Sequence, residues 1–337
     1  MCTTHRFSLI VPPTTYVYGT LFTIFAIVAA VGNIIALYIL WTTSRQITKS
    51  NKILVSLAVS DMLTGLVGFP ISTYEMVSDH IESCDLDNIR SMVSLILTGS
   101  SNLTLALISF DRWLLMCKYT RYNTLMNNKI LPVLIVICWV YPGITISLRY
   151  VENIYPYLAS LVFIFYGPIL FIIVFYFLLV REIYRSEKKL NLHGRRHILG
   201  QSNKVSNLPA PVSTLSVPDT ANKLAARQAK RSQRRHLKTA RAVAWLLGIY
   251  CICMAPFNLW LIFSILNPTF SIIQREPLQH WYVFGISVAG LNSCLNPFVY
   301  LSKQPDARKR LRTILKLDKN KPKMDGSRTD MGTDSKI

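Results

Sequence analysis

The chain has 337 residues, of which 51% are hydrophobic and only 16% are charged. Soluble proteins carry about 25% charged residues, so the composition argues against a soluble protein and favours an integral membrane protein. A formal net charge of +20 would also suit a nucleic-acid-binding protein. The position of the charges along the chain therefore has to decide between these classes.

Seven segments are apolar over about 20 residues, the length that a helix needs to cross a bilayer core of roughly 30 Å. The alternative is a large soluble protein with seven core helices, but such helices would carry charged outer faces, which these segments mostly lack. The fold class that follows is an all-α integral membrane protein, a seven-transmembrane helix bundle. The predicted spans are residues 16–43, 52–77, 88–117, 130–149, 155–180, 239–266 and 279–302.

An odd number of spans places the two termini on opposite sides of the membrane. With an extracellular tail at residues 1–15, four of the 37 Lys and Arg lie outside, namely Arg6, Arg90, Arg149 and Arg275. All the others lie inside, which is the positive-inside pattern. It predicts a multi-pass plasma-membrane protein with a cytoplasmic C-terminus, and it explains the net charge without a nucleic-acid partner.

The bundle, residues 16–302, contains one long predicted cytoplasmic loop, at about 184–236. This loop is polar, so we expect much of it to be disordered, with a basic helix at its end that leads into the sixth span. Three prolines interrupt it, at Pro209, Pro211 and Pro218.

The chain beyond the last span is predicted to contain one more helix. Residues 303–317 place apolar side chains on one face and basic ones on the others, which predicts an interfacial amphipathic eighth helix in contact with membrane lipids. Residues 318–337 are predicted to form a disordered cytoplasmic tail. The last three residues, Ser335 to Ile337, match the pattern that PDZ domains bind.

Polar residues and prolines inside the spans are costly or disruptive and mark candidate functional sites. In chain order they are Asn33, Asp61, the Asp111-Arg112-Trp113 end of the third span, Pro168 and Tyr176, Pro256, and the sequence "NPFVY" from Asn296 to Tyr300. This series resembles that of the rhodopsin-like (class A) G-protein-coupled receptors over about residues 16–316. The resemblance implies a receptor that activates a heterotrimeric G protein, with arrestin as a further partner.

The resemblance assigns an activation switch to the inner end of the third span. The acid holds Arg112 in the inactive receptor and releases it toward the G protein, a two-state element. The alternative is a simple ion pair at the membrane interface. His236 replaces an acid that often adds a second restraint in the family, which predicts higher basal activity. The implied switch residues are Asp111, Arg112, Tyr176, Pro256, Asn296, Pro297 and Tyr300.

Asp61 lies in mid-membrane, where a lone carboxylate is expensive. The resemblance implies a sodium site around it, because the side chains at matching positions offer the oxygen ligands that a hard cation prefers. The alternative is a structural acid that is hydrogen-bonded to Asn33. The implied residues are Asn33, Asp61, Ser101, Asn292 and Asn296, with Asp61 and Ser101 as direct sodium ligands.

The outer face lacks the family's common disulfide. Asp87 stands at the third-span position of that bridge, and the short loop at about 149–156 contains no cysteine. A bridge between Cys2 and Cys84, the two cysteines on the oxidising side, is an alternative. A short loop without this bridge is similar to the branch that contains cannabinoid, lysophospholipid and melanocortin receptors.

The resemblance also bears on the ligand. Gly290 stands where a retinal-binding Lys would be, and Ser94 stands where amine receptors have an Asp, although Glu75 could substitute for that acid. Arg90 is either a surface residue paired with Asp87 or Glu75, or the anchor for an acidic or carbonyl-bearing ligand such as a lipid. The alternative ligand is an amine or small peptide. The candidate pocket residues are Arg90, Ser94, Leu97, Thr98, Ser160, Phe257, Asn258, Leu261, Tyr282 and Ile286.

Two other function classes are weaker. An enzyme would need a catalytic constellation, and the sequence contains no metal motif or nucleophile elbow. A transporter would show internal repeats and broken helices near the midplane, and no repeat is evident. Met254, in place of the family's usual Trp beneath the ligand, predicts that signal transmission differs in detail.

Overall fold

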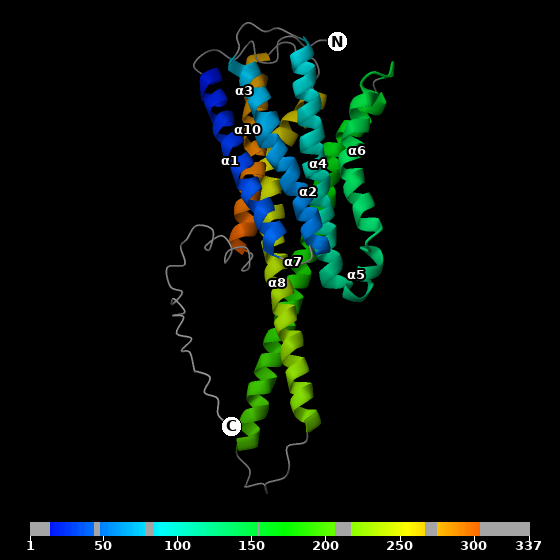
Figure 1. Cartoon of the computed structure of the whole chain (residues 1–337), viewed down its shortest axis with the longest axis vertical. Helices are drawn as coiled ribbons and strands as arrows, with labels where there is room; N and C mark the ends of the chain where they lie inside the picture. Colours follow the sequence, from blue (N-terminus) through cyan, green and yellow to red (C-terminus); the bar gives the residue numbers. More distant parts are fainter. Residues whose placement is uncertain are drawn as a thin grey trace, which may run out of the picture.

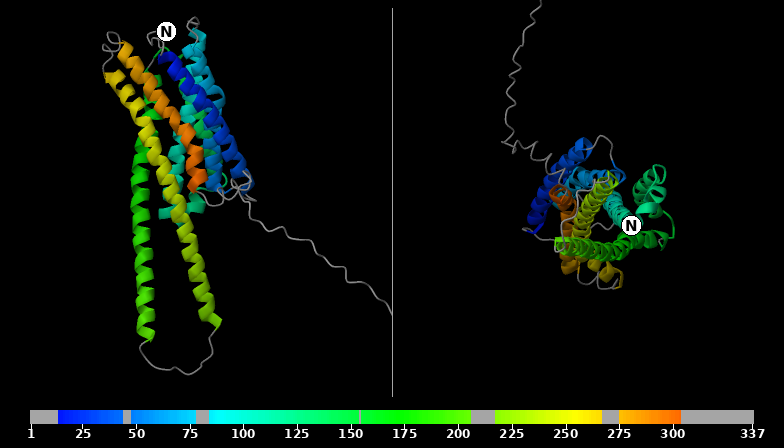
Figure 2. Two further views of the ribbon diagram at one scale, coloured as in Figure 1. Left: turned by 90° about the vertical axis from the view of Figure 1, so that its left-hand side faces the viewer. Right: turned by 90° about the horizontal axis from the view of Figure 1, so that it is seen from below.

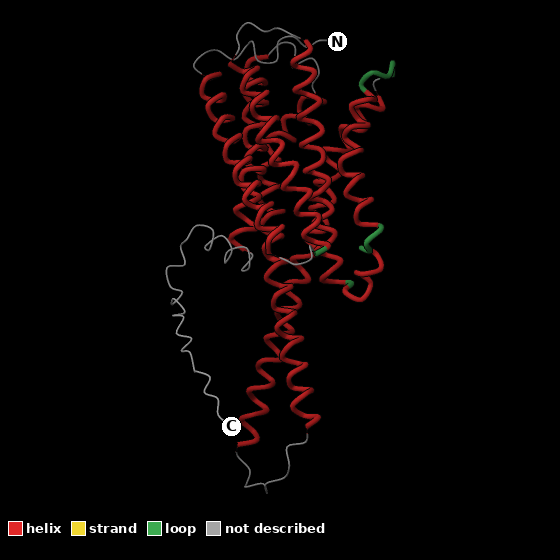
Figure 3. Tube along the Cα trace, in the orientation of Figure 1, coloured by secondary structure: helices red, strands yellow, loops and turns green. Residues whose placement is uncertain are grey.

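The structure is a computed structural model that describes residues 14–43, 48–77, 84–153, 155–205, 217–266 and 275–303. These residues are almost entirely helical and include no strand (Figure 3). The elements are α1 (Thr14–Thr43), α2 (Lys49–Leu63), η1 (Thr64–Gly68), α3 (Phe69–Val77), α4 (Cys84–Cys117), α5 (Tyr119–Leu125), α6 (Ile130–Leu148), α7 (Tyr155–Val205), α8 (Val217–Leu266) and α10 (Arg275–Lys303). Together they form an elongated helix bundle (Figure 1).

Six spans of the described chain are long and apolar enough to cross a membrane. Their outward faces carry large apolar side chains that a soluble protein would bury, among them Trp41, Ile252 and Leu259, which are 57–73% exposed. Such a surface suits lipid rather than water. The predicted membrane bundle is therefore confirmed, and the observed spans agree with the predicted ones within a few residues.

The seventh helix of the bundle is α10, which packs against α8 and α1. It is less apolar than the other six because its inner face carries Asn292, Ser293 and Asn296, all of which are buried. A helix with polar residues on its inner face is stable in a membrane when those residues find partners inside the protein. The polarity of α10 thus marks the position of a polar core.

The second span consists of α2, η1 and α3 in continuous succession. The π-helical turn η1 lies against α1, and a Cβ atom on Gly65 would come within 2.5 Å of the Ala30 backbone nitrogen. Only glycine permits this contact between the two backbones. A second link fixes the other side of the span, where the Trp139 indole on α6 donates to Ser56 Oγ at 2.9 Å.

The apolar core lies between α2, α4 and α8, on the half of the bundle nearer to α5. Leu57, Leu105 and Leu247 are each completely buried there. Close packing of this kind is the main attraction between helices in lipid, because lipid tails remove the hydrophobic drive for association.

Much of the predicted long loop is helical in the described chain, and its disorder stays a prediction. Helices α7 and α8 continue far beyond the bundle as a pair (Figure 2), α7 as far as Val205 and α8 from Val217. Residues 186–205 contain no proline, so nothing interrupts the helix that the fifth span begins. Pro218 stands in the first turn of α8, where a proline is tolerated. Only residues 206–216 of this loop lie outside the described chain.

Several predicted features lie outside the described residues. They are Cys2, the amphipathic helix at 303–317 from residue 304 onward, the tail at 318–337 and the PDZ pattern at its end. The side chains of Cys84, Asp87, His236 and Tyr300 are also outside the described part, although their backbones belong to helices.

Candidate functional site

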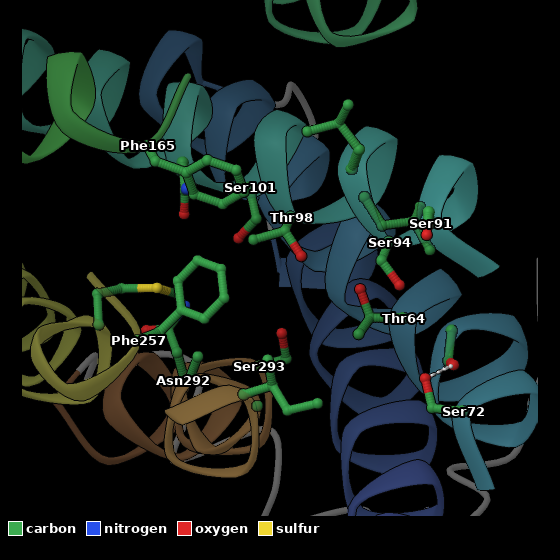
Figure 4. Close-up of a pocket in the computed structure, with 18 of the residues that line it drawn as sticks. Thr64, Ser72, Ser91, Ser94, Thr98, Ser101, Phe165, Phe257, Asn292 and Ser293 are labelled. Carbon is green, nitrogen blue, oxygen red and sulfur yellow. Dashed lines mark hydrogen bonds between the residues drawn. The ribbon is translucent and has the colours of Figure 1, made fainter. Parts of the chain in front are cut away.

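A cavity of about 300 Å³ lies inside the bundle, toward the end opposite α5. One of its walls is a stripe on α4, with Arg90, Ser94, Leu97, Thr98 and Ser101 at helical spacing. Figure 4 shows Ser94, Thr98 and Ser101 on this wall, and Asn292 and Ser293 of α10 across from them. The cavity combines an apolar lining with a few polar groups, as ligand sites commonly do.

The predicted pocket residues divide into two groups. Eight of them line this cavity, namely Arg90, Ser94, Leu97, Thr98, Phe257, Leu261, Tyr282 and Ile286. The other two, Ser160 and Asn258, do not, and their placement in the pocket needs correction.

Ser160 and Asn258 face away from the cavity because of helical register. On α7 the lining residues are Tyr157, Leu161 and Phe165, and Ser160 lies about 100° around the helix from Leu161. The Ser160 hydroxyl donates instead to the Tyr157 carbonyl at 2.8 Å. Asn258 lies beside Phe257 on α8, donates to the Met254 carbonyl, and accepts from Tyr166 of α7 at its own carbonyl.

Arg90 is buried, with 4% of its surface exposed, and forms an ion pair through Nε with Glu75 Oε2. The prediction of a Glu75 partner is therefore confirmed, but the prediction of a surface position is wrong. Among the described residues that line the cavity, Arg90 is the single charged one. Its positive charge is balanced by a carboxylate that does not itself line the cavity.

An aromatic group on α7, α8 and α10 forms the opposite wall. Phe165 and Phe257 have ring centroids 5.3 Å apart, and those of Trp260 and Tyr282 are 4.6 Å apart. Phe165 and Trp260 were not among the predicted pocket residues. Their signal was the spacing, because Phe165 follows Leu161 by four residues and Trp260 follows Phe257 by three, so each pair shares one helix face.

Below the cavity lies a buried polar core around Asp61, which is 0% exposed. Its Oδ1 accepts from Ser293 Oγ at 2.8 Å and from Ser101 Oγ at 3.3 Å, and its Oδ2 accepts from Asn296 Nδ2 at 2.7 Å. Three side chains from α4 and α10 therefore hold this carboxylate on α2. A carboxylate is tolerated in the interior when hydrogen bonds of this kind replace its contacts with water.

The polar core also explains the role of Asn33. Its amide donates to the Ser293 carbonyl at 3.1 Å and to the Ala29 carbonyl at 2.8 Å, and so ties α1 to α10. Ser293 was not predicted, although it is the shortest hydroxyl contact of Asp61; its position between Asn292 and Asn296 was the available signal. Asn292 is 1% exposed, and its Oδ1 has no hydrogen-bond partner among the described residues.

The predicted switch lies at the α5 end of α4. Arg112 Nε is 3.4 Å from Asp111 Oδ2, and both residues are at most 5% exposed. A charge-assisted N–H···O bond is normally about 2.7–2.9 Å long, so this contact is a loose one. The stronger partners of Asp111 are hydroxyls, Tyr122 Oη on Oδ1 and Ser50 Oγ on Oδ2, both at 2.8 Å.

Tyr122 and Ser50 were not predicted, because the contact depends on how the short helix α5 folds back against α2 and α4. Lys49 Nζ lies 5.7 Å from the Tyr122 ring centroid, which adds a cation–π contact. Burial, together with the Asp111 carboxylate, raises the pKa of Tyr122 to about 12. The hydroxyl therefore stays protonated and donates to Asp111 throughout the physiological range.

The remaining predicted switch residues lie on α7, α8 and α10. Pro256 and Pro297 lie inside α8 and α10. Tyr176 of α7 packs against the apolar core and against a smaller cluster formed by α7 and α8. The Tyr300 side chain lies outside the described part, so the predicted second position of Arg112 between two tyrosines stays a prediction.

Comparison with known proteins gives consistent matches. The family model for the 7 transmembrane receptor (rhodopsin family) matches residues 32–153 and 145–300. Adenosine receptor A2a of Homo sapiens is 23% identical, with 89% of this chain and 72% of that protein covered. 5-Hydroxytryptamine receptor 4 of Homo sapiens is 26% identical, over 87% and 77%. Trace amine-associated receptor 1 of Mus musculus is 24% identical, over 88% and 87%.

Proposed function

The chain belongs to the rhodopsin family of seven-transmembrane receptors, and we propose that it converts the binding of a small extracellular ligand into nucleotide exchange on a heterotrimeric G protein. The observation that carries the proposal is the arrangement along one helix. Helix α4 lines the ligand cavity from Arg90 to Asn102 and carries the Asp111–Arg112 pair near its other end. A ligand that shifts α4 or its neighbours changes the surroundings of both sites.

In this proposal the protein lies in the plasma membrane with its N-terminus outside. The positive-inside pattern supports that orientation. It places the α5 end of the bundle and the extensions of α7 and α8 in the cytoplasm, where the G protein and arrestin are. The cavity then faces the extracellular side.

We further propose a sodium ion at the polar core. Asp61 and Ser101 are direct ligands, and Asn33, Asn292 and Asn296 complete the surrounding polar core. The donor set supports this assignment, since a carboxylate, hydroxyls and an amide oxygen without a hydrogen-bond partner among the described residues suit a hard cation. Ser293 joins the set because its hydroxyl also contacts Asp61.

The ligand that the cavity favours carries an acidic or carbonyl group near Arg90. Arg90 is the single charged residue among the described residues of the cavity wall, and a guanidinium is a strong donor to such acceptors. A cavity of about 300 Å³ is at the lower end of the range for small-molecule sites. It supports a compact ligand better than a lipid with a long acyl tail.

An amine is the second candidate, because the relatives include receptors named for 5-hydroxytryptamine and trace amines. An ammonium group needs a carboxylate, and the described cavity wall offers none. Glu75 would have to exchange its Arg90 partner for the ligand. This makes Arg90 and Glu75 the pair of residues that separates the two candidates.

The experiment is a ligand-library screen on cells that carry the full-length receptor, read by nucleotide exchange and by arrestin recruitment. Arg112→Ala, which alters no cavity residue, serves as the background control. Compounds that activate wild type but not Arg112→Ala support the receptor function. If no compound in a broad library distinguishes wild type from Arg112→Ala in either readout, the proposed function fails.

For each hit, Arg90→Ala and Glu75→Gln then identify the ligand class. Loss of a charge-assisted hydrogen bond costs about 1.5–3 kcal/mol, roughly ten- to over a hundredfold in affinity. We expect Arg90→Ala to weaken binding by that factor and Arg90→Lys to weaken it less. Damage by Glu75→Gln together with indifference to Arg90→Ala would contradict the acidic or carbonyl ligand and establish the amine.

A further inference from the structure

The cavity extends unusually far along the bundle. On α4 its lining residues run from Arg90 to Asn102, a difference of twelve residues, or about 18 Å of helix. On α10 they run from Tyr282 to Ser293, about 16 Å. The deep end therefore reaches Ser101 and Ser293, the two hydroxyls that donate to Asp61.

The width of the deep end depends on Met254. It is the deepest of the α8 residues on the cavity wall and is 4% exposed. A methionine side chain is slim and flexible, whereas a tryptophan at this position would occupy much more of the space between α4 and α10. The slim methionine thus leaves room for the cavity to continue past this level.

Asn102 is the feature of the deep end that lacks a structural explanation. It is 0% exposed, lines the cavity, and both its amide nitrogen and its amide oxygen have no hydrogen-bond partner among the described residues. A buried polar group without a partner costs about 1–3 kcal/mol. A residue on the cavity wall with two such groups is suited to a molecule that offers an acceptor and a donor.

We propose that Asn102 forms a deep subsite of the cavity that takes a neutral group able both to donate and to accept hydrogen bonds, such as a carboxamide, a hydroxyl or the edge of a heterocycle. This deepens the proposed receptor function, on which it rests, by naming a second recognition point about 18 Å along α4 from Arg90. The ligand class that follows is compact and elongated, with an acceptor group at the Arg90 end and a neutral polar group at the deep end.

Neutrality follows from the distribution of charge around the cavity. No described residue on the wall of the deep end is charged, and Arg90 is at the other end of the cavity. A charged ligand group transferred there would lose its hydration without a free counter-charge. Asp61 does not itself line the cavity, and its carboxylate is held by three side chains and balanced by the proposed sodium ion. A neutral amide or hydroxyl meets no such penalty.

The test uses thiol-reactive probes of different charge on the purified full-length receptor, with no need for the natural ligand. Asn102→Cys places a thiol at the deep end and Ser91→Cys places one at the outer end of the same wall. Wild type, with its seven native cysteines, gives the background. The probes are hydroxyethyl, trimethylammonioethyl and sulfonatoethyl methanethiosulfonate, and intact-protein mass spectrometry measures the rate of labelling.

We expect the hydroxyethyl probe to label Asn102→Cys above the wild-type background. Relative to Ser91→Cys, both charged probes should be slower at Asn102→Cys by more than about tenfold, because burial of an ion costs several kcal/mol. Adding Met254→Trp should reduce labelling at the deep cysteine by at least about tenfold, or 1.4 kcal/mol, and leave Ser91→Cys unchanged.

Two results would overturn the proposal. Absence of labelling at Asn102→Cys by the neutral probe would show that the deep end is closed. Equal or faster relative labelling by the cationic probe would show that the deep end admits an organic cation, which contradicts a subsite for a neutral group. Ser293→Cys, on the facing wall, gives the same readout if Asn102→Cys does not fold. Labelling rates do not depend on a G protein, so this failure is distinguishable from failure of the receptor function.

Discussion

Two arginines on helix α4 are both buried and both paired with a carboxylate, yet the structure gives them different freedom. Arg90 pairs with Glu75 of α3, so its ion pair joins two helices. Arg112 pairs with its own neighbour in sequence, Asp111, so its ion pair joins none. They are 22 residues apart, about 33 Å along the helix, or one on each side of a membrane.

The difference shows that the location of the partner, and not burial alone, decides what a buried charge can do. Separating Arg90 from Glu75 requires a change between α3 and α4. Arg112 can leave Asp111 without any helix moving, because Ser50 and Tyr122 already hold that carboxylate from α2 and α5 at 2.8 Å. Arg90 is thus held between two helices, as suits its proposed role as a fixed recognition point, whereas the single Arg112 contact suits the predicted two-position switch.

The largest expected effect comes from Arg112→Ala. It should abolish G-protein activation and leave surface expression and thermal stability close to those of wild type, since Asp111 keeps its two hydroxyl donors. The measurement is nucleotide exchange on a purified G protein, with Arg149→Ala as a matched control at the other end of the bundle. Normal exchange by Arg112→Ala would remove the assignment of this residue as the switch.

Arg90→Ala should instead damage the fold. Breaking a buried ion pair by removing one partner costs about 3–5 kcal/mol, and it leaves the Glu75 carboxylate unpaired. We expect a clearly lower thermal midpoint in detergent, and a large recovery in the double variant Arg90→Leu with Glu75→Leu, because two apolar residues leave no buried charge. A midpoint that Arg90→Ala leaves unchanged would contradict the helix-joining role.

Asp61 offers an intermediate case, a buried carboxylate that is held by neutral donors alone. Asp61→Asn should remove the sodium sensitivity of agonist affinity while the bundle stays folded, because an amide replaces the charged sodium ligand. The assay compares agonist binding in sodium chloride with binding in the chloride of a bulky organic cation. Wild type that responds equally to both salts would exclude the sodium site.

Tyr122→Phe should have the smallest effect, and it tests the hydroxyl that holds Asp111 beside Arg112. The raised pKa of Tyr122, about 12 against an ordinary 10, means that the unfolded chain loses this proton before the folded chain does. The stability that Tyr122 contributes is therefore complete below pH 10 and is lost as pH rises toward 12. The thermal midpoint of Tyr122→Phe should fall less over that window than the wild-type midpoint does; equal slopes would contradict the buried hydroxyl.

The sequence predicted those features that repeat along a helix. The seven spans follow from runs of apolar residues, and the α4 wall of the cavity follows from the spacing of Arg90, Ser94 and Thr98. The partners of Asp61 were predicted in part through family positions. The spans and the cavity wall rest on local patterns, which a sequence records directly, whereas the partners of Asp61 rest on the family resemblance.

Features that depend on how separate helices meet were not predictable in this way. The contact of Tyr122 with Asp111 depends on how α5 folds back against α2 and α4. The orientation of Ser160 and Asn258 depends on the rotation of α7 and α8 about their own axes, which the sequence does not define to within one residue. The extension of α7 to Val205 was not predicted either, because a polar composition does not by itself indicate a helix.

The most direct test of the receptor account is ligand-free nucleotide exchange by the full-length protein in phospholipid vesicles with purified heterotrimeric G proteins. The loose 3.4 Å contact of Arg112 predicts a measurable basal rate. We expect wild type to accelerate exchange above empty vesicles for at least one G-protein class, and Arg112→Ala to remain at the empty-vesicle rate. The account would be contradicted if wild type accelerated exchange for no G-protein class, or if wild type and Arg112→Ala gave equal rates.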